Sequence, residues 1–208
     1  MSRVSKPLGA VITVLLCALA VPAYGAPSTT AQPDSRVDAG SAGQRLTPDE
    51  VKDLARLAPA QFARAQESLS RSSAAATFYR IVNDGSGRCL AIGSSSTDNG
   101  AHAIQWECLE NSLGQIWYDD GDHIVNFNSG KCLAIGSSST DNGAHAIQWE
   151  CLDKSPGQVW YRSGSQIVNG HSGKYLAIGS SSTANGAHAI QWEATGSLGQ
   201  SWYQWPVA

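Results

Sequence analysis

Residues 90–109 read LAIGSSSTDNGAHAIQWECL, and the same twenty letters return unchanged at residues 133–152. A third copy begins at residue 176 and continues to Glu193 with a single substitution, Ala184 in place of aspartate. Matching residues lie 43 positions apart, and the third copy is one residue shorter after Glu193. Periods of this length are typical of folds built from repeated structural units. We therefore place three repeats at residues 78–120, 121–163 and 164–205.

The local pattern inside each repeat indicates β-structure. Short segments rich in β-branched and aromatic residues, such as FYRIV and AIQWEC, alternate with turn clusters such as GSSSTDNG. This alternation predicts about four short strands per repeat. A propeller needs at least four blades, and an open solenoid needs terminal repeats with a polar outer face. Three copies that end near Trp205 therefore favour a closed threefold structure.

The N-terminal residues 1–25 have the pattern of a secretory signal peptide. Arg3 and Lys6 precede an apolar stretch at residues 8–21, and small residues lead to a cleavage site near Gly25. The apolar stretch is shorter than the about 20 residues that span a bilayer. We expect a secreted, extracellular protein that does not insert into the membrane after signal removal, in an oxidising environment.

The next segment differs in composition from the repeats. Residues 26–45 are rich in Ala, Ser, Thr, Pro and Gln, which is typical of a disordered leader. Residues 46–77 have helical spacing, with Thr47 and Glu50 in the positions of a capping box and Pro59 as a break. We interpret 46–77 as a partly helical linker or stalk, with a propeptide or docking helix as the alternative.

The cysteine positions predict disulfides within single repeats. Four cysteines remain after signal removal, and four cysteines allow three pairings. The third repeat has lost both cysteines together, with Tyr175 and Ala194 at the equivalent positions. The joint loss predicts one bridge in each of the first two repeats, Cys89–Cys108 and Cys132–Cys151. The clustered spacing of a metal site is missing from these cysteines, so we expect neither a metal nor a cofactor.

Composition and motifs argue against two other functions. A net charge of -3 and only 15% charged residues do not provide the basic face that nucleic acid requires. No nucleophile elbow, phosphate loop or zinc motif occurs in the sequence. Asp119 and Asp120 are adjacent and expected to diverge, while the other candidate catalytic groups occur in triplicate. We therefore do not expect an enzyme.

Three Gln-x-Trp triplets, at residues 115–117, 158–160 and 200–202, accompany the repeated stretch SGKCLAIGSSSTDNGAHAIQWEC. Together these motifs resemble the ricin B-type β-trefoil lectins, which also occur as carbohydrate-binding modules of secreted bacterial proteins. The resemblance covers nearly all of residues 78–208. It implies an all-β β-trefoil of three repeats with pseudo-threefold symmetry, preceded by the short partly helical segment. It also implies a monomeric lectin that binds glycans or polysaccharides.

The triplets and a second set of indoles are expected to have different roles. Alternate residues of a strand share one face, so the Gln and Trp of each triplet are expected in the common core. These core residues are Gln115, Trp117, Gln158, Trp160, Gln200 and Trp202. In the resembling family an aromatic residue beside the second cysteine stacks on a sugar ring. The corresponding candidates for up to three shallow sugar sites are Trp106, Trp149 and Trp192, with Asp98, Asn99, His102, Asp141, Asn142, His145, Asn185 and His188 from the polar loops.

Alternative roles remain open for these candidates. The indoles could simply cover the disulfides, the Asn-Gly pairs are typical of tight turns, and the loop Asp and His residues could be solvent-exposed filler. Because Ala184 lacks the carboxylate of Asp98 and Asp141, the sugar site of the third repeat is expected to be the weakest.

Three departures from the family pattern leave the identity of the sugar open. The glutamine that commonly lies two places before the stacking aromatic lies one place before it, at Gln105, Gln148 and Gln191. Alanine stands where the family usually has a sugar-binding aspartate, at Ala91, Ala134 and Ala177. Glycine stands where it often has asparagine, at Gly114, Gly157 and Gly199. The alternative function is a protein-binding trefoil, a secreted inhibitor or adhesin with degenerate sugar sites.

Overall fold

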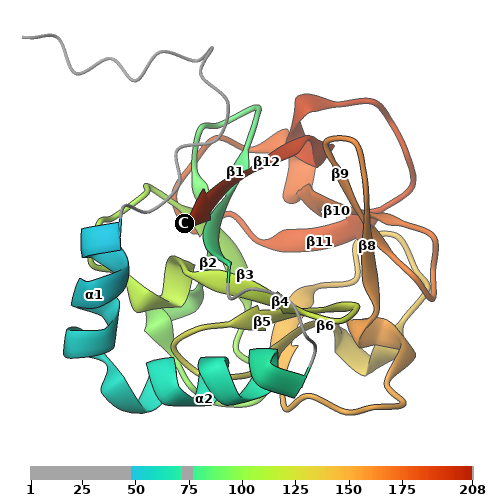
Figure 1. The fold of residues 1–208 in the computed structure, drawn as a ribbon. Coiled ribbons are helices and arrows are strands. Elements are labelled where there is room, and N and C mark those ends of the chain that lie inside the picture. The colour runs from blue at the N-terminus through green and yellow to red at the C-terminus, as the bar shows by residue number, and fades with distance from the viewer. Residues whose placement is uncertain (1–47, 72–76, 208) are drawn as a thin grey trace, which may run out of the picture. The chain divides into compact units, whose positions relative to one another are not determined.

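The computed structural model describes residues 48–71 and 77–207 of the chain (Figure 1). The predicted signal peptide, the predicted leader and Thr47 of the capping box lie outside the described residues.

The repeated part of the chain forms a β-trefoil, as predicted, with four strands in each of three lobes (Figure 1). The strands of lobe 1 are β1 (Phe78–Asn83), β2 (Cys89–Ile92), β3 (Ala103–Trp106) and β4 (Trp117–Asp120). Those of lobe 2 are β5 (His123–Asn126), β6 (Cys132–Ile135), β7 (Ala146–Trp149) and β8 (Trp160–Ser163). Those of lobe 3 are β9 (Gln166–Asn169), β10 (Tyr175–Ile178), β11 (Ala189–Trp192) and β12 (Trp202–Val207).

The first and last strands of each lobe form a closed ring. β1 pairs with β4 and β12, β4 pairs with β5, and β8 pairs with β9, all antiparallel. The Trp160 amide donates to the Asp122 carbonyl at 2.8 Å, and the Trp202 amide donates to the Ser165 carbonyl at 2.7 Å, which links the remaining neighbours. The middle strands of each lobe form hairpins, β2–β3, β6–β7 and β10–β11. Each hairpin has the same four-residue register, so equivalent side chains occupy equivalent places in all three lobes.

One buried tryptophan from each lobe joins the ring to its own hairpin. Trp117, Trp160 and Trp202 begin the last strands of their lobes, and at most 4% of each side chain is exposed. Their indole N–H groups donate to main-chain carbonyls of the hairpins, those of Leu90, Leu133 and Leu176, at 2.9–3.0 Å. A buried indole N–H needs such a partner, so these bonds let the largest side chain fill the core.

The glutamine of each triplet lies in a 3₁₀ turn rather than in a strand. These turns are Leu113–Gln115, Pro156–Gln158 and Leu198–Gln200. The expectation that Gln and Trp share a strand face was therefore wrong, because the strand begins only at the tryptophan. The glutamines are nonetheless buried, and each holds a neighbouring segment of its own lobe.

Two helices precede the trefoil and share its core. α1 (Pro48–Leu57) and α2 (Pro59–Arg71) are separated by Ala58, consistent with the break predicted at Pro59. The helices bury Leu54, Ala58, Ala65 and Leu69 in the same cluster as the lobe residues. No helix among the described residues is long and apolar enough to cross a membrane.

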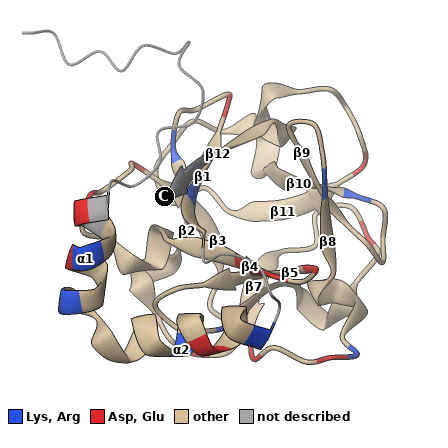
Figure 2. Cartoon of the chain, viewed as in Figure 1, with Lys and Arg blue, Asp and Glu red and all other residues tan. Residues whose placement is uncertain are grey.

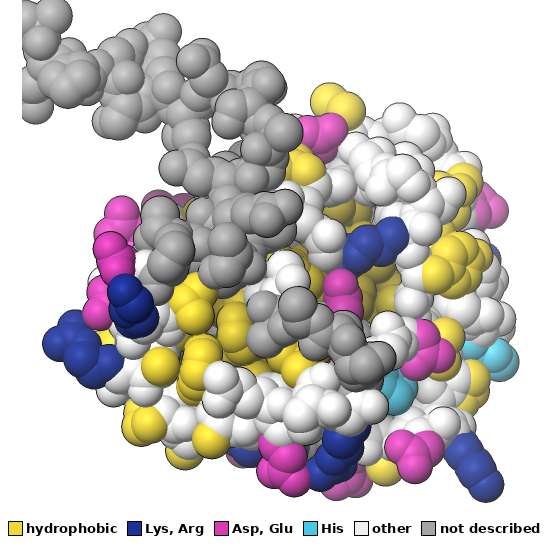
Figure 3. Space-filling model, in the orientation of Figure 1, with side chains coloured by type: hydrophobic (Ala, Val, Ile, Leu, Met, Phe, Trp, Pro, Cys, Tyr) yellow, Lys and Arg dark blue, Asp and Glu magenta, His cyan; other side chains and the backbone are white. Residues whose placement is uncertain are grey.

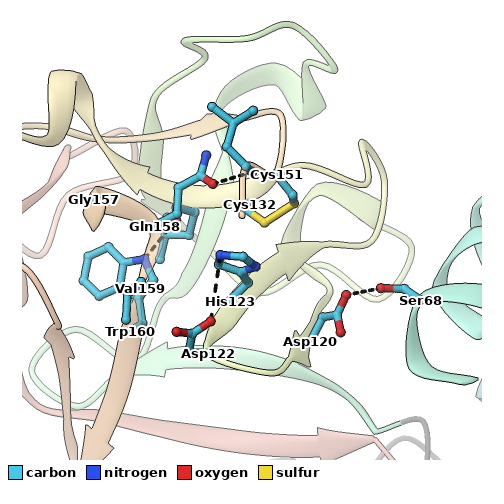
Figure 4. A network of polar contacts seen from close by, with 12 residues as sticks. Ser68, Asp120, Asp122, His123, Cys132, Cys151, Gly157, Gln158, Val159 and Trp160 are labelled. Carbon is cyan, nitrogen blue, oxygen red and sulfur yellow. Dashed lines mark hydrogen bonds and ion pairs between the residues drawn. A yellow bond between two sulfur atoms is a disulfide. The ribbon is translucent and has the colours of Figure 1, made fainter. Parts of the chain in front are cut away.

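The helices lie on a part of the trefoil where the repeat symmetry is broken. The ring of Phe78 lies 5.8 Å from that of Phe62 in α2 and 5.3 Å from that of Phe127. The other lobes have Gly121 and Gly164 at the position of Phe78. Arg64 donates to the Ser129 carbonyl at 3.1 Å, and Ser68 bonds the Asp120 carboxylate (Figure 4). The extra apolar surface of lobes 1 and 2 is therefore covered by this N-terminal segment.

Charged side chains of both signs are interspersed on the visible face of the structure. Figure 2 shows basic and acidic residues on both helices and strands, and Figure 3 shows hydrophobic and neutral polar groups between the charged ones.

Candidate functional site

An exposed indole stands at the end of the second hairpin strand of every lobe. Trp106, Trp149 and Trp192 are the last residues of β3, β7 and β11, and 38–39% of each is exposed. Trp106 pairs with Cys89 across its hairpin, and Trp149 pairs with Cys132. The fold therefore presents an equivalent indole to solvent in every lobe, at a point that the hairpin ladder holds in place.

In lobes 1 and 3 the indole lines an open cavity. The cavity beside Trp106 has a volume of about 340 Å³, and the one beside Trp192 about 370 Å³. The lining of each includes the alanine at the family's usual aspartate position, a Gly-Ser-Ser turn, two isoleucines and the triplet glutamine. A flat apolar surface bordered by a few hydroxyl groups is the arrangement that suits a small polar ligand with apolar patches.

The Gly-Ser-Ser turn holds two serines in a backbone conformation that is uncommon for them. Ser94 and Ser95 have φ angles of 54° and 49°, in the left-handed region, and lobes 2 and 3 repeat both values within one degree. Non-glycine residues at positive φ are uncommon and often occur at functional sites. In the sequence this feature appears as a thrice-repeated Gly-Ser-Ser-Ser, which by itself indicates only a turn. The missed residues are Ser94, Ser95, Ser137, Ser138, Ser180 and Ser181.

This turn explains why glycine replaces the family's usual asparagine. A Cβ atom at Gly114 would lie 2.7 Å from the Ser95 hydroxyl oxygen, and one at Gly199 would lie 2.6 Å from that of Ser181. The serine turn thus occupies the space that a side chain at Gly114 or Gly199 would need. Ala91 and the serine turn that faces Gly114 line the same cavity beside Trp106.

Replacing Gly157 by alanine is expected to destabilise the protein. The new Cβ would lie 2.9 Å from the Ser138 Cα and 3.0 Å from the Ile135 carbonyl oxygen, so backbone must move. We expect a loss of about 1–3 kcal/mol in the free energy of unfolding, measured by denaturant titration. Gly136→Ala is the matched control, because its Cβ would meet nothing nearer than 3.7 Å. Equal stability of the two variants would contradict the close packing of this turn.

The polar loop of each lobe, Asp-Asn-Gly in lobes 1 and 2 and Ala-Asn-Gly in lobe 3, lies against the next lobe rather than its own indole. The Gln148 amide of lobe 2 donates to the carbonyls of Ser96 and Asp98 in lobe 1, at 2.8 and 2.9 Å. A Cβ at Gly100 would lie 3.8 Å from the Trp149 ring. The same contacts join the loop of lobe 2 to the indole strand of lobe 3, and the loop of lobe 3 to that of lobe 1. Each indole is therefore flanked by a loop from the preceding lobe.

The loop residues divide into structural and free groups. The Asn99 side-chain oxygen accepts from the Glu150 amide at 2.9 Å, which ties lobe 1 to lobe 2. Asn142 and Asn185 accept in the same way from Glu193 and Glu107. The asparagines thus join lobes, whereas the carboxylates of Asp98 and Asp141 are exposed, and each accepts a hydrogen bond from a serine hydroxyl of its own loop.

The three loop histidines meet one another instead of lining the indole cavities of lobes 1 and 3. The ring centroids of His102, His145 and His188 are 4.8–4.9 Å apart. Burial lowers the pKa of the His102 imidazole, and the nearby His188 and His145 lower it further. The histidines therefore form a separate cluster where the three lobes converge.

The triplet glutamines position the segment that follows each indole. The Gln115 amide donates to the Glu107 carbonyl at 2.7 Å, and its oxygen accepts from the Leu109 amide at 2.8 Å. In Figure 4 the equivalent Gln158 of lobe 2 points toward the chain at Cys151, beside the disulfide. Both predicted disulfides, Cys89–Cys108 and Cys132–Cys151, are present.

The adjacent carboxylates of Asp119 and Asp120 bind different partners, consistent with the expectation that they diverge. Asp119 pairs with Arg162 at 3.1 Å and accepts from the Tyr79 hydroxyl, while Asp120 accepts from Ser68 of α2. Burial raises the pKa of the Tyr79 phenol well above its usual value. The cavity that Asp119 and Arg162 line includes the buried Trp160 but none of the three exposed indoles.

Comparison with known proteins identifies the family. Residues 77–202 match the family described as the ricin-type beta-trefoil lectin domain, and the chain belongs to that family. No curated protein matches the chain.

Among solved structures, the designed threefold-symmetric protein ThreeFoil is 33% identical with a TM-score of 0.57, over 61% of this chain and 96% of that one. An exo-beta-1,3-galactanase from Clostridium thermocellum is 32% identical with a TM-score of 0.56, over 62% of this chain and 30% of that one. The C-terminal half of an earthworm R-type lectin, in complex with GalNAc, is 20% identical with a TM-score of 0.55, over 62% of this chain and 97% of that one, and shows likeness of fold alone.

Proposed function

We propose that the protein is a secreted lectin that binds one sugar residue beside each exposed indole. The observation that carries the proposal is the repeated surface of Trp106, Trp149 and Trp192, which in two lobes lines an open cavity with serine hydroxyls at its edge. A pyranose ring can lay its C–H face on an indole while its hydroxyls bond the polar rim. Family membership supports the same activity.

Secretion is supported by the signal-peptide pattern and by the two disulfides, which persist in oxidising compartments. A shallow site for one sugar typically has a dissociation constant in the millimolar range, about 4 kcal/mol of binding free energy. Three such sites on one rigid body bind more tightly to a glycan that presents repeated ends. The protein is therefore expected to prefer branched or polymeric glycans to free monosaccharides.

A glycan array probed with the full chain, followed by competition with the free sugar, tests this function. Binding to a defined set of glycans that the free sugar displaces is the expected result. Capture of a protein from culture medium that free sugar does not displace, with no glycan bound, would instead support the protein-binding alternative.

The crossing of loops between lobes changes which site should be weakest. The loop beside Trp106 comes from lobe 3, where Ala184 replaces the aspartate, whereas Trp149 and Trp192 are flanked by the loops that carry Asp98 and Asp141. If the carboxylate accepts a sugar hydroxyl, the site of lobe 1 lacks that bond. The sequence alone predicts the weakest site in lobe 3, because Ala184 belongs to the third repeat.

Variants that retain a single exposed indole test whether the weakest site is in lobe 1 or in lobe 3. The variant with Trp149→Ala and Trp192→Ala retains only the lobe 1 site, and we expect its affinity to be about fivefold lower than that of the two other single-site variants, corresponding to about 1 kcal/mol. Calorimetric titration with the best sugar from the array measures this difference. Adding Ala184→Asp to the lobe 1 variant is expected to restore the affinity. Equal affinity at all three sites, unaffected by Ala184→Asp, would contradict a role for the aspartates while leaving the indole sites intact.

A further inference from the structure

Three histidines that are 43 residues apart in sequence converge at the junction of the three lobes. Each immediately precedes the second hairpin strand of its lobe, and each takes part in an isolated bridge to an adjacent lobe: His102 with Ile147, His145 with Ile190, and His188 with Ile104. These bridges close a ring around the pseudo-threefold axis, so the main chain at all three histidines is held by two lobes at once.

The main chain at the histidines is also fixed within each lobe. The His102 carbonyl accepts from the Gly93 amide at 3.0 Å, and the His145 and His188 carbonyls accept from Gly136 and Gly179 at the same distance. The side chains, by contrast, are exposed. The backbone therefore sets three imidazoles in a fixed triangle and leaves their rings free to turn.

The imidazole nitrogens are close enough together to share one ligand. One nitrogen from each ring can be chosen so that the three atoms lie within 4.8 Å of one another, and the rings meet edge to face at 76–78°. A tetrahedral zinc ion with Zn–N bonds of about 2.0–2.1 Å holds its nitrogen ligands about 3.4 Å apart. The exposed rings can turn toward the axis to bring their nitrogens closer together.

We propose that His102, His145 and His188 bind one divalent transition-metal ion of the zinc, nickel and copper class on the pseudo-threefold axis, through one nitrogen each. Neutral imidazole suits these ions, whereas calcium and magnesium prefer oxygen ligands. Three protein ligands leave a fourth position open toward solvent, which water or an anionic ligand can fill. This metal site is separate from the indole cavities, and it does not depend on the proposed sugar binding.

The metal would join the three lobes at a single point. Each ligand comes from a different lobe, so the site exists only when the trefoil is folded, and binding to the folded state alone raises the free energy of unfolding. A zinc-dependent rise in the unfolding temperature is therefore the expected physical consequence.

The test uses the full chain without a histidine tag, treated with chelator and then dialysed. Calorimetric titration with zinc chloride is expected to show one ion bound per chain. Copper(II) added in place of zinc is expected to show nitrogen hyperfine splitting in its electron paramagnetic resonance spectrum, a readout of imidazole ligation. Absence of saturable zinc binding, or of nitrogen coupling with copper, would overturn the proposal.

Single replacements locate the site. His102→Asn, His145→Asn and His188→Asn are each expected to weaken zinc binding at least tenfold, because each removes one of three ligands. His171→Asn is the matched control, since His171 is an exposed histidine of lobe 3 outside the cluster, and it should bind zinc as the unmodified chain does. Circular dichroism of each variant without metal confirms that it is folded. A folded His102→Asn variant with unchanged affinity, or an equal loss in His171→Asn, would assign the zinc to other groups.

Discussion

A chain with Trp106, Trp149 and Trp192 all replaced by alanine is expected to lose detectable glycan binding. Truncating a well-packed aromatic anchor at a binding surface removes about 2 kcal/mol or more, roughly a thirtyfold loss at each site. From a millimolar starting point such a loss puts each site beyond measurement, and the gain from multivalency disappears with it. The indoles are partly exposed strand ends, so the triple variant should remain folded. Array signal and calorimetric titration with the best glycan measure the effect.

Two controls separate loss of the indole from loss of the fold. A triple variant with phenylalanine at the same three positions keeps a flat apolar ring and is expected to retain most of the binding. Tyr161→Ala removes an aromatic residue that is 51% exposed and lies outside the indole cavities of lobes 1 and 3, and it should bind glycans normally. Unchanged binding by the folded alanine variant would overturn the proposed sites in all three lobes.

The fold could be predicted because the repeat specifies local structure three times. Strand segments and turn clusters recur at a fixed period. Each of the three units has an apolar face, which it can bury only against the other two units. The disulfide pairing also followed from sequence, because a bridge within a repeat disappears as a unit when both Tyr175 and Ala194 replace its cysteines. The strand pattern and the disulfide pairing are both properties of a single repeat, so the spacing of residues in the sequence was sufficient to predict them.

Properties that depend on neighbouring lobes could not be predicted in the same way. The repeat shows that Asp98 and Trp106 recur at the same spacing. It does not show whether the loop that carries Asp98 packs beside Trp106 of its own lobe or beside Trp149 of the next lobe. The hydrogen bonds of Gln148 determine the crossing, and a long-range contact of this kind leaves no mark in the local pattern. The histidine cluster could not be predicted for the same reason. Equivalent residues of the three lobes contact one another only when they lie close to the pseudo-threefold axis, and the repeat period does not reveal that distance. The packing of α2 against Phe78 likewise depends on a departure from the repeat.

Removing both disulfides is expected to produce the largest loss of stability. Each bridge joins cysteines 19 residues apart and closes a loop of that size, which is worth about 3 kcal/mol in the loop-entropy model. Replacing the four disulfide-bonded cysteines by alanine should therefore lower the free energy of unfolding by about 6 kcal/mol, a large part of the about 5–15 kcal/mol typical of a folded domain. Denaturant titration of the variant and the oxidised parent measures the difference. A loss below about 1 kcal/mol would contradict it.

Lobe 3 offers the converse experiment, because it has the same hairpin without a bridge. Tyr175 pairs with Trp192 across β10 and β11 in the register by which Cys89 pairs with Trp106, so Tyr175→Cys with Ala194→Cys should form a third disulfide in the same geometry. The new bridge would restrict the unfolded chain by a similar amount, and an increase of up to about 3 kcal/mol is expected under oxidising conditions. Either cysteine substitution alone is the control and should give no increase. A gain that persists after reduction would show that the stabilisation comes from altered packing at residue 175 and not from the loop closed by the bridge.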